Sequence, residues 1–144
     1  MTKVEIKFTK TNEDARIPTR NFDTDTGFDI YSVETIAIPA RGSTVVDVGL
    51  MFAYITPGYW IKIEGRSGLG FKHGITPHPG IIDQGYRGTA GIKLYNNTDT
   101  EYTVKRGERI AQLIVYRNYY VEMSEVENVE ESERGAKGFG SSGK

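Results

Sequence analysis

The sequence contains no cysteine, which excludes disulfide bridges, thiolate metal ligands and a cysteine nucleophile. No stretch of it approaches the roughly 18 consecutive apolar residues that a membrane-spanning helix needs. Its first residues (MTKVEIKF) carry charges where a signal peptide would have an apolar run. We therefore expect an intracellular, cytoplasmic protein without a membrane partner.

The chain also lacks an excess of either charge, because 18 basic residues face 19 acidic ones for a formal net charge of −1. A protein that coats nucleic acid would carry a clear positive excess, so we expect no nucleic-acid partner. With 144 residues, the chain is long enough for a single domain with its own hydrophobic core.

Short apolar or alternating runs, separated by turn residues, make up most of the sequence. Many short strands with turn signals about every 8–12 residues are typical of a β-sandwich or barrel. Only residues 67–73, which lie among glycines, offer a short helical turn, so the expected fold is all-β. The expected strands are 4–8, 36–38, 44–48, 50–55, 59–63, 91–95, 102–104 and 110–116.

The last part of the chain differs in composition from the rest. Residues 122–133 include six glutamates and no lysine or arginine, and the residues after them are rich in glycine and serine. Two interpretations are open for the acidic stretch: a solvated connecting arm, or a short helix, because Ser124 and Glu127 have capping-box spacing. We expect a β domain over residues 1–121 and a C-terminal arm over residues 122–144.

Three segments combine glycines with charged or reactive groups. Segment 65–68 (GRSG) is either an ordinary polar turn or a phosphate site, because it pairs a cation and a hydroxyl with unhindered backbone amides. In segment 80–88 (GIIDQGYRG), Asp83 either activates a water as a general base or caps a turn. In segment 134–143 (RGAKGFGSSG), Phe139 either stacks on a planar ring or belongs to a disordered tail. Together the segments predict a pocket for a planar base with several phosphates.

These segments and two more resemble the five ordered motifs of the homotrimeric deoxyuridine triphosphatase (dUTPase) family. The motifs are 26–30 (TGFDI), 65–68, 80–88, 107–114 (GERIAQLI) and 134–143. The resemblance implies a distorted β jelly-roll with a short helix and a flexible C-terminal arm that closes over the active site. It also implies a homotrimer with shared active sites, and it is compatible with a viral or phage source.

The activity that the resemblance implies is Mg²⁺-dependent hydrolysis of dUTP to dUMP and pyrophosphate. This reaction limits uracil incorporation into DNA and supplies dUMP for thymidylate synthesis. Two other functions are compatible with the same fold: a dCTP deaminase-like enzyme and a nucleotide-binding regulatory protein. The deaminase needs a glutamate after the third motif, where this chain has Lys93. His78 precedes that motif where small residues are common, which leaves the pocket entrance open to interpretation.

The resemblance also assigns roles to individual residues. Asp83 would activate the water that attacks the α-phosphorus. Asp29 would contact Mg²⁺ through water while substrate phosphates hold the ion, and Arg109 would support the site. The base and sugar would contact Gly80, Ile81, Ile82, Tyr86, Gly91 and Phe139. The phosphates would contact Arg66, Ser67, Gly68, Gln112, Arg134, Gly140, Ser141 and Ser142.

Overall fold

The computed structural model describes residues 3–140 and 143 of the chain. Over these residues the structure consists of β-strands and one short helix, as the sequence predicts. In this same part of the chain, no helix has the length and apolar character needed to cross a membrane. The elements are β1 (Ile6–Lys10), β2 (Phe28–Tyr31), β3 (Ile36–Ile38), β4 (Ser43–Val46), β5 (Leu50–Ile55), β6 (Tyr59–Glu64), α1 (Ser67–His73), β7 (Ile75–Pro77), β8 (Gly80–Ile82), β9 (Ile92–Asn96), β10 (Tyr102–Val104) and β11 (Arg109–Arg117).

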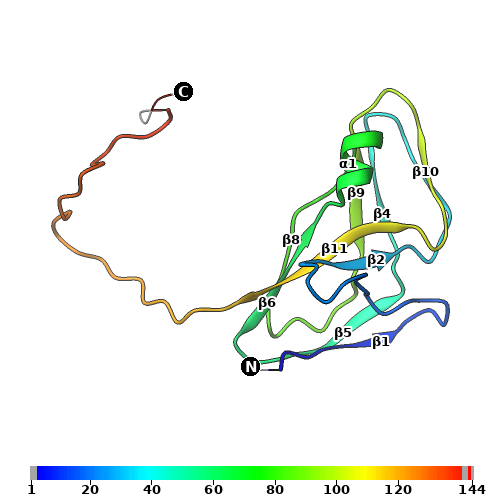
Figure 1. Ribbon diagram of the computed structural model, residues 1–144, viewed down its shortest axis with the longest axis horizontal. Coiled ribbons are helices and arrows are strands. Elements are labelled where there is room, and N and C mark those ends of the chain that lie inside the picture. The colour runs from blue at the N-terminus through cyan, green and yellow to red at the C-terminus, as the bar shows by residue number, and fades with distance from the viewer. Residues whose placement is uncertain (1–2, 141–142, 144) are drawn as a thin grey trace.

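The strands pair antiparallel in four sheets. The largest has the order β2-β11-β6-β8, the next has the order β4-β9-β7, and β1-β5 and β10-β3 form two-stranded sheets. Most strands pair with a strand that is distant in the sequence, so the fold depends on long-range pairing. Figure 1 shows the strands gathered into one body, with the chain after β11 running out from it as a long extended arm.

The strands β2 and β7 are absent from the sequence-based expectation, and β8 is expected only as part of a hairpin. The alternation in Phe28–Tyr31 is incomplete, because Ile30 and Tyr31 are both buried and only the first two residues are half-exposed. Strand β7 has three residues and ends in a proline, a residue that is usually absent from sheet interiors. Both strands are therefore stabilised by their sheet partners more than by local sequence.

The core contains one apolar face from each sheet. Phe52 of β5, Ile61 of β6, Leu94 of β9 and Val104 of β10 are each at most 1% exposed. Full burial of such side chains stabilises a fold by about 1.5–3 kcal/mol each before the entropy of ordering is subtracted. Because β11 pairs with both β2 and β6, the core also fixes the ends of these three strands, where the charged residues of the second and fourth motifs lie.

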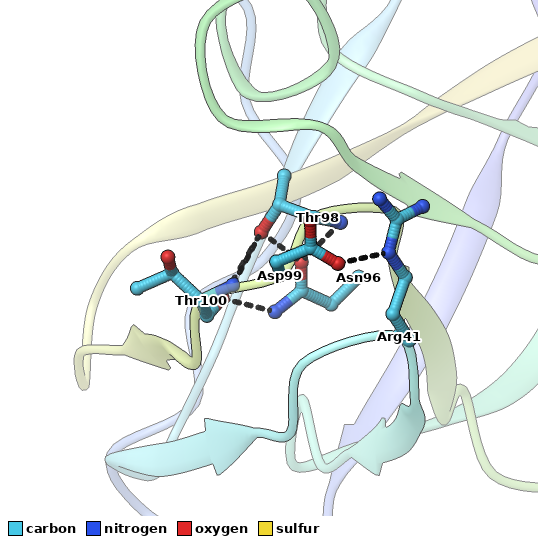
Figure 2. A network of polar contacts seen from close by, with 5 residues as sticks. All are labelled: Arg41, Asn96, Thr98, Asp99 and Thr100. Atoms are coloured by element: carbon cyan, nitrogen blue, oxygen red, sulfur yellow. Dashed lines mark hydrogen bonds and ion pairs between the residues drawn. The ribbon is translucent and has the colours of Figure 1, made fainter.

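A buried amide closes the turn between β9 and β10. Asn96 is 2% exposed, and its Nδ2 atom donates hydrogen bonds to the backbone oxygens of Ile38 (3.2 Å) and Thr100 (2.9 Å). Its Oδ1 atom accepts hydrogen bonds from the backbone N–H (3.0 Å) and the hydroxyl (2.7 Å) of Thr98. Figure 2 shows this network beside the exposed ion pair of Arg41 and Asp99. With both of its polar atoms bonded, Asn96 fixes the turn without the cost of a buried unpaired group.

The same turn holds the C-terminal end of α1. Gly74 follows the helix with a φ of 65°, a left-handed conformation that favours glycine. The backbone N–H of Asn97 donates to the Gly74 carbonyl at 3.0 Å, and the Asn97 side-chain amide donates to the same oxygen at 3.1 Å. The helix whose first residues belong to the phosphate-binding motif is therefore anchored at its other end.

Candidate active site

A pocket of 360 Å³ lies where β2, β11 and the start of α1 meet the loop before β2. It brings together residues of three motifs that lie far apart in the sequence: 26–30, 65–68 and 107–114. The lining residues are Arg20, Asn21, Asp25, Thr26, Gly27, Asp29, Arg66, Ser67, Gly68 and Gln112. Most of the residues expected to bind phosphate in the body of the protein therefore lie together.

Asp29 is the electrostatic centre of the pocket. Its Oδ1 atom accepts a hydrogen bond from Nε of Arg66 at 2.9 Å, and its Oδ2 atom lies 3.8 Å from Nη1 of Arg109. The Asp29 side chain is only 16% exposed, so these two interactions are partly shielded from water. One carboxylate thus faces two guanidinium groups, so the cluster of Asp29, Arg66 and Arg109 carries one net positive charge.

Arg109 also packs against an aromatic ring that the sequence did not single out. The guanidinium of Arg109 lies 5.9 Å from the ring centroid of Tyr31, and that of Arg16 lies 3.9 Å from the same ring. Tyr31 is 2% exposed, and its hydroxyl is hydrogen-bonded to the Thr19 hydroxyl. The buried tyrosine therefore helps to orient Arg109 toward Asp29, in keeping with the supporting role expected for this arginine.

Gln112 connects the first and second motifs. Its Nε2 atom donates to the backbone oxygen of Gly65 at 2.8 Å, and its side chain lies directly over Gly27. A Cβ atom at Gly27 would overlap the Gln112 amide, so a larger residue there would displace this side chain. Gln112 is thus a structural bridge in addition to lining the pocket.

The second motif supplies the start of the helix. Arg66 occupies the N-cap position in an extended conformation (φ −95°, ψ 138°), and no side chain caps the first turn. The first backbone N–H groups of a helix have no partner within it. Ser67 and Gly68 are exposed at this end and line the pocket, and no side chain of the described residues caps their turn.

The third motif begins with β8 and lies on a different part of the molecule. Gly80 and Ile82 are half-buried, while Ile81 is 67% exposed. Asp83 follows directly and is exposed, and its backbone oxygen accepts a hydrogen bond from the Tyr86 N–H at 3.0 Å. The Asp83 backbone therefore forms a turn, while its side chain is exposed, so both interpretations of Asp83 stay open.

Tyr86 is fixed within the same loop. Its hydroxyl donates to the backbone oxygen of Thr89 at 2.9 Å, and its ring lies edge-on to Phe52 at 5.9 Å. The ring is still 41% exposed, so one side of it can contact a ligand. Gly91 is exposed just before β9.

Asp83 and Arg66 lie at opposite ends of β6. Strand β8 pairs with β6 so that Ile82 is opposite Ile61 and Gly80 is opposite Ile63. Asp83 is therefore level with position 60, six residues before Arg66. At about 3.3 Å per extended residue, the two are separated by about 20 Å along the sheet. Within one chain, the expected general base lies far from the phosphate pocket.

The part of the fifth motif that the structure describes, residues 134–140 and 143, lies on the arm, away from the body (Figure 1). Residues 118–140 contain no helix, so the capping-box spacing of Ser124 and Glu127 does not produce one. Arg134 is exposed and its Nε atom donates to the backbone oxygen of Lys137 at 2.6 Å. Phe139 and Gly140 are fully exposed, and the expected phosphate ligands Ser141 and Ser142 lie outside the described residues.

A buried carboxylate beside the pocket was not foreseen from the sequence. The Tyr102 hydroxyl donates to Oε1 of Glu108 at 2.7 Å, and Oε2 of Glu108 is buried with no hydrogen-bond partner in the described part of the chain. Burial, assisted by Glu108, raises the pKa of Tyr102 to about 12. Glu108 precedes Arg109 in the fourth motif, but no sequence signal pairs it with Tyr102.

Comparison with known proteins agrees with this geometry. The dUTPase family model matches residues 13–143. The deoxyuridine 5'-triphosphate nucleotidohydrolase of Kluyveromyces lactis is 40% identical over 99% of this chain and 93% of its own length. The enzyme of the same name from Nautilia profundicola is 41% identical over 98% of this chain and 100% of its own length.

Solved structures are similar over nearly the whole chain. The Staphylococcus bacteriophage 80alpha dUTPase with dUpNHpp has a TM-score of 0.88 and 32% identity, covering 96% of this chain and 98% of its own. A dUTPase from phage phi11 of S. aureus, described with a structural Mg(II) ion, has a TM-score of 0.80 and 27% identity, covering 88% and 99%. The chain belongs to the dUTPase family, and its fold is the jelly-roll-like β fold of that family.

Proposed function

We propose that this protein hydrolyses dUTP to dUMP and pyrophosphate. The observation that carries the proposal is the pocket in which Asp29, Arg66, Ser67, Gly68 and Gln112 lie together in a member of the dUTPase family. A fixed cation, free backbone amides and a hydroxyl form a site for a polyphosphate chain. The relatives are named deoxyuridine 5'-triphosphate nucleotidohydrolases, and these names indicate dUTP as the substrate.

The active site is shared between copies in a homotrimer. The separation of about 20 Å between Asp83 and Arg66 along β6 supports this arrangement, because one chain does not bring its own base to its own phosphate pocket. In a closed assembly of identical chains, Asp83 of one copy is presented to Arg66 of the next. The exposure of Ile81 and Tyr86 beside Asp83 is consistent with a surface that another chain covers.

Asp83 acts as the general base in this mechanism. Its carboxylate takes a proton from the water that attacks the α-phosphorus, and the pyrophosphate leaves on the opposite side. Arg66, Ser67, Gly68 and Gln112 hold the phosphates in line and stabilise the charge that develops on their oxygens. Base catalysis of this kind contributes about 10²–10⁴-fold, and the positioning of the phosphates supplies most of the rest.

The loop from Gly80 to Gly91 selects the base and the sugar. Its backbone donors and acceptors match the O4 acceptor and N3 donor of uracil and reject the reversed pattern of cytosine. Such hydrogen-bond mismatches discriminate by about 10⁴–10⁵. Tyr86, held by Thr89 and Phe52, lies under the deoxyribose and leaves no room for a ribose 2′-hydroxyl.

The residues of the pocket fit a magnesium ion that is held mainly by the substrate. Both oxygens of Asp29 face guanidinium groups, so this carboxylate suits contact through water better than direct coordination. Among residues 3–140 and 143, no three His, Asp or Glu side chains gather as a metal site. When bound, the ion neutralises phosphate charge and orients the displacement.

The C-terminal arm, residues 122–144, closes over the bound nucleotide. Phe139 stacks on the uracil, and Arg134, Gly140, Ser141 and Ser142 contact the outer phosphates. The extended course of the arm and the full exposure of Phe139 in the free chain support a segment that becomes ordered on a ligand. Closure excludes water and completes the set of positive charges.

A pyrophosphate-release assay across dUTP, UTP, dCTP and dTTP, with and without Mg²⁺, tests the proposal. Release from dUTP alone, dependent on Mg²⁺, is the expected result. Ammonia release from dCTP would instead assign a deaminase, although the position expected for its glutamate carries Lys93. Binding of dUTP without release of any product would assign a regulatory nucleotide-binding protein.

A further inference from the structure

The phosphate pocket contains an arginine that neither the five motifs nor the proposed mechanism uses. Arg20 lines the same pocket as Asp29, Arg66 and Gln112, in a wall formed by the loop before β2. The residue itself is exposed. Arg20 and Phe28 also line another pocket, so the link of the guanidinium to the phosphate pocket is its Nη1 atom, which bonds to Asp25 of the pocket lining.

The Arg20 side chain is held in place without a ligand. Its Nη1 atom donates to the backbone oxygen of Asp25 at 3.2 Å, and its guanidinium carbon lies 4.5 Å from the ring centroid of Phe28. The loop itself is fixed, because Oδ2 of Asp25 accepts a hydrogen bond from the Phe22 N–H at 3.1 Å. A side chain ordered in advance loses less conformational entropy when it binds a ligand.

The charge of Arg20 is less compensated than that of its neighbours. Arg66 and Arg109 both face the carboxylate of Asp29, at 2.9 and 3.8 Å. Arg20 forms no ion pair within the described residues, and its bond to Asp25 is made to a backbone oxygen. The Asp25 carboxylate also lines the pocket, where its Oδ2 atom accepts the Phe22 N–H, and within the described residues it forms no ion pair with Arg20.

We propose that Arg20 binds the polyphosphate tail of the nucleotide and so acts as a phosphate-binding residue outside the five motifs. This inference rests on the proposed function and names an additional residue of the same site. A guanidinium carries five N–H donors in a planar fork that matches phosphate oxygens. Since only one of these donors is engaged by Asp25, the rest are available to phosphate oxygens in the pocket.

The test is titration calorimetry of the full chain with inorganic pyrophosphate and, separately, with dUMP, both in the presence of Mg²⁺. The variants are Arg20→Gln and Arg20→Lys, with Arg41→Gln as the matched control. Arg41 is also an exposed arginine, but it pairs with Asp99 beside the β9–β10 turn and does not line the pocket (Figure 2). Thermal melting verifies that each variant is folded.

We expect Arg20→Gln to weaken pyrophosphate binding about 10- to 100-fold, the loss of one charge-assisted hydrogen-bonded contact. Binding of dUMP by Arg20→Gln stays unchanged, and its KM for dUTP rises. The pyrophosphate affinity of Arg20→Lys lies between those of Arg20→Gln and wild type, because lysine keeps the charge but lacks the planar set of guanidinium donors. Arg41→Gln behaves as wild type. The inference is overturned if Arg20→Gln matches Arg41→Gln, or if it weakens dUMP as much as pyrophosphate. The titration does not require turnover, so failure of wild-type protein to hydrolyse dUTP would refute the proposed function separately.

Discussion

The Nε atom of Arg66 donates to Oδ1 of Asp29 at 2.9 Å and thereby joins the residue that caps α1 to strand β2. The two side chains are 30% and 16% exposed. A second Asp–Arg pair in the molecule, Asp99 with Arg41, has a similar distance of 2.7 Å but side chains that are 85% and 63% exposed. The protein thus contains one partly buried ion pair in the candidate site and one exposed ion pair that serves as its control.

Replacement of Asp29 by asparagine should destabilise the fold and impair hydrolysis. Arg66 and Arg109 would face each other across a partly buried pocket with no carboxylate between them. We expect a loss of about 1–3 kcal/mol in the free energy of unfolding, measured by urea titration. Asp99→Asn, which breaks an exposed pair, should cost at most about 1 kcal/mol. Equal losses for the two variants would contradict the central role given to Asp29.

Replacement of Asp83 by asparagine should lower kcat for dUTP about 10²–10⁴-fold, because the amide does not take a proton from water. Binding of a non-hydrolysable dUTP analogue should persist in calorimetry, since Asp83 is not among the phosphate ligands. Asp99→Asn serves again as control and should keep full activity. A fully active Asp83→Asn protein would remove the general-base assignment.

Two inactive variants should restore activity when mixed. Asp83→Asn keeps its phosphate pocket, and Arg66→Ala keeps its base. If each site takes the two residues from different chains, co-refolded mixtures should have working sites. Equal random mixing makes about a quarter of the sites complete in a cyclic assembly. Turnover that stays at the level of the separate variants would show that one chain supplies both residues.

Removal of the ring at Phe139 should weaken nucleotide binding through loss of stacking on the base. Stacking of one base contributes about 1–3 kcal/mol, so Phe139→Ala should raise KM for dUTP about 10- to 100-fold. Truncation after Glu133 should depress hydrolysis further, with the oligomer unchanged in light scattering. Val129→Ala, another fully exposed apolar position on the arm, is the control. If the truncated protein hydrolysed dUTP at the wild-type rate, the arm would have no role in the reaction.

Alkaline pH should destabilise the protein through Tyr102. Its pKa is raised to about 12 in the folded state from the ordinary value of 10.0. The folded state therefore holds this proton more tightly, and the associated stability is complete below pH 10 and is lost between about pH 10 and 12. Urea titrations of Tyr102→Phe should show a shallower decline over that range than wild type. Parallel declines would contradict the raised pKa of Tyr102.

The sequence predicted the fold class well because alternation and turn residues report directly on strands. The helix over 67–73 was recognised as a single turn between glycines, and it is α1. The sequence does not mark β7 and β8 as separate strands. Each has only three residues, too few for a clear alternation, and each is stabilised by pairing with another strand, β7 with β9 and β8 with β6.

The site was predictable only in part. Motif positions named Asp29, Arg66 and Gln112, and the structure brings all three together. No local pattern indicates that Gln112 lies over Gly27, that Tyr31 packs against Arg109, or that Tyr102 pairs with Glu108. Each of these contacts joins residues on different elements, so it is determined by the packing of the sheets.

The position of Asp83 and Arg66 at opposite ends of β6 has a consequence for how the enzyme responds to its own concentration. In the shared-site arrangement proposed above, a solitary chain contains both Asp83 and Arg66 but has no complete catalytic centre. Dilution below the dissociation constant of the oligomer should therefore abolish turnover while circular dichroism still reports a folded β protein, and the specific rate should rise again as the chain concentration is increased.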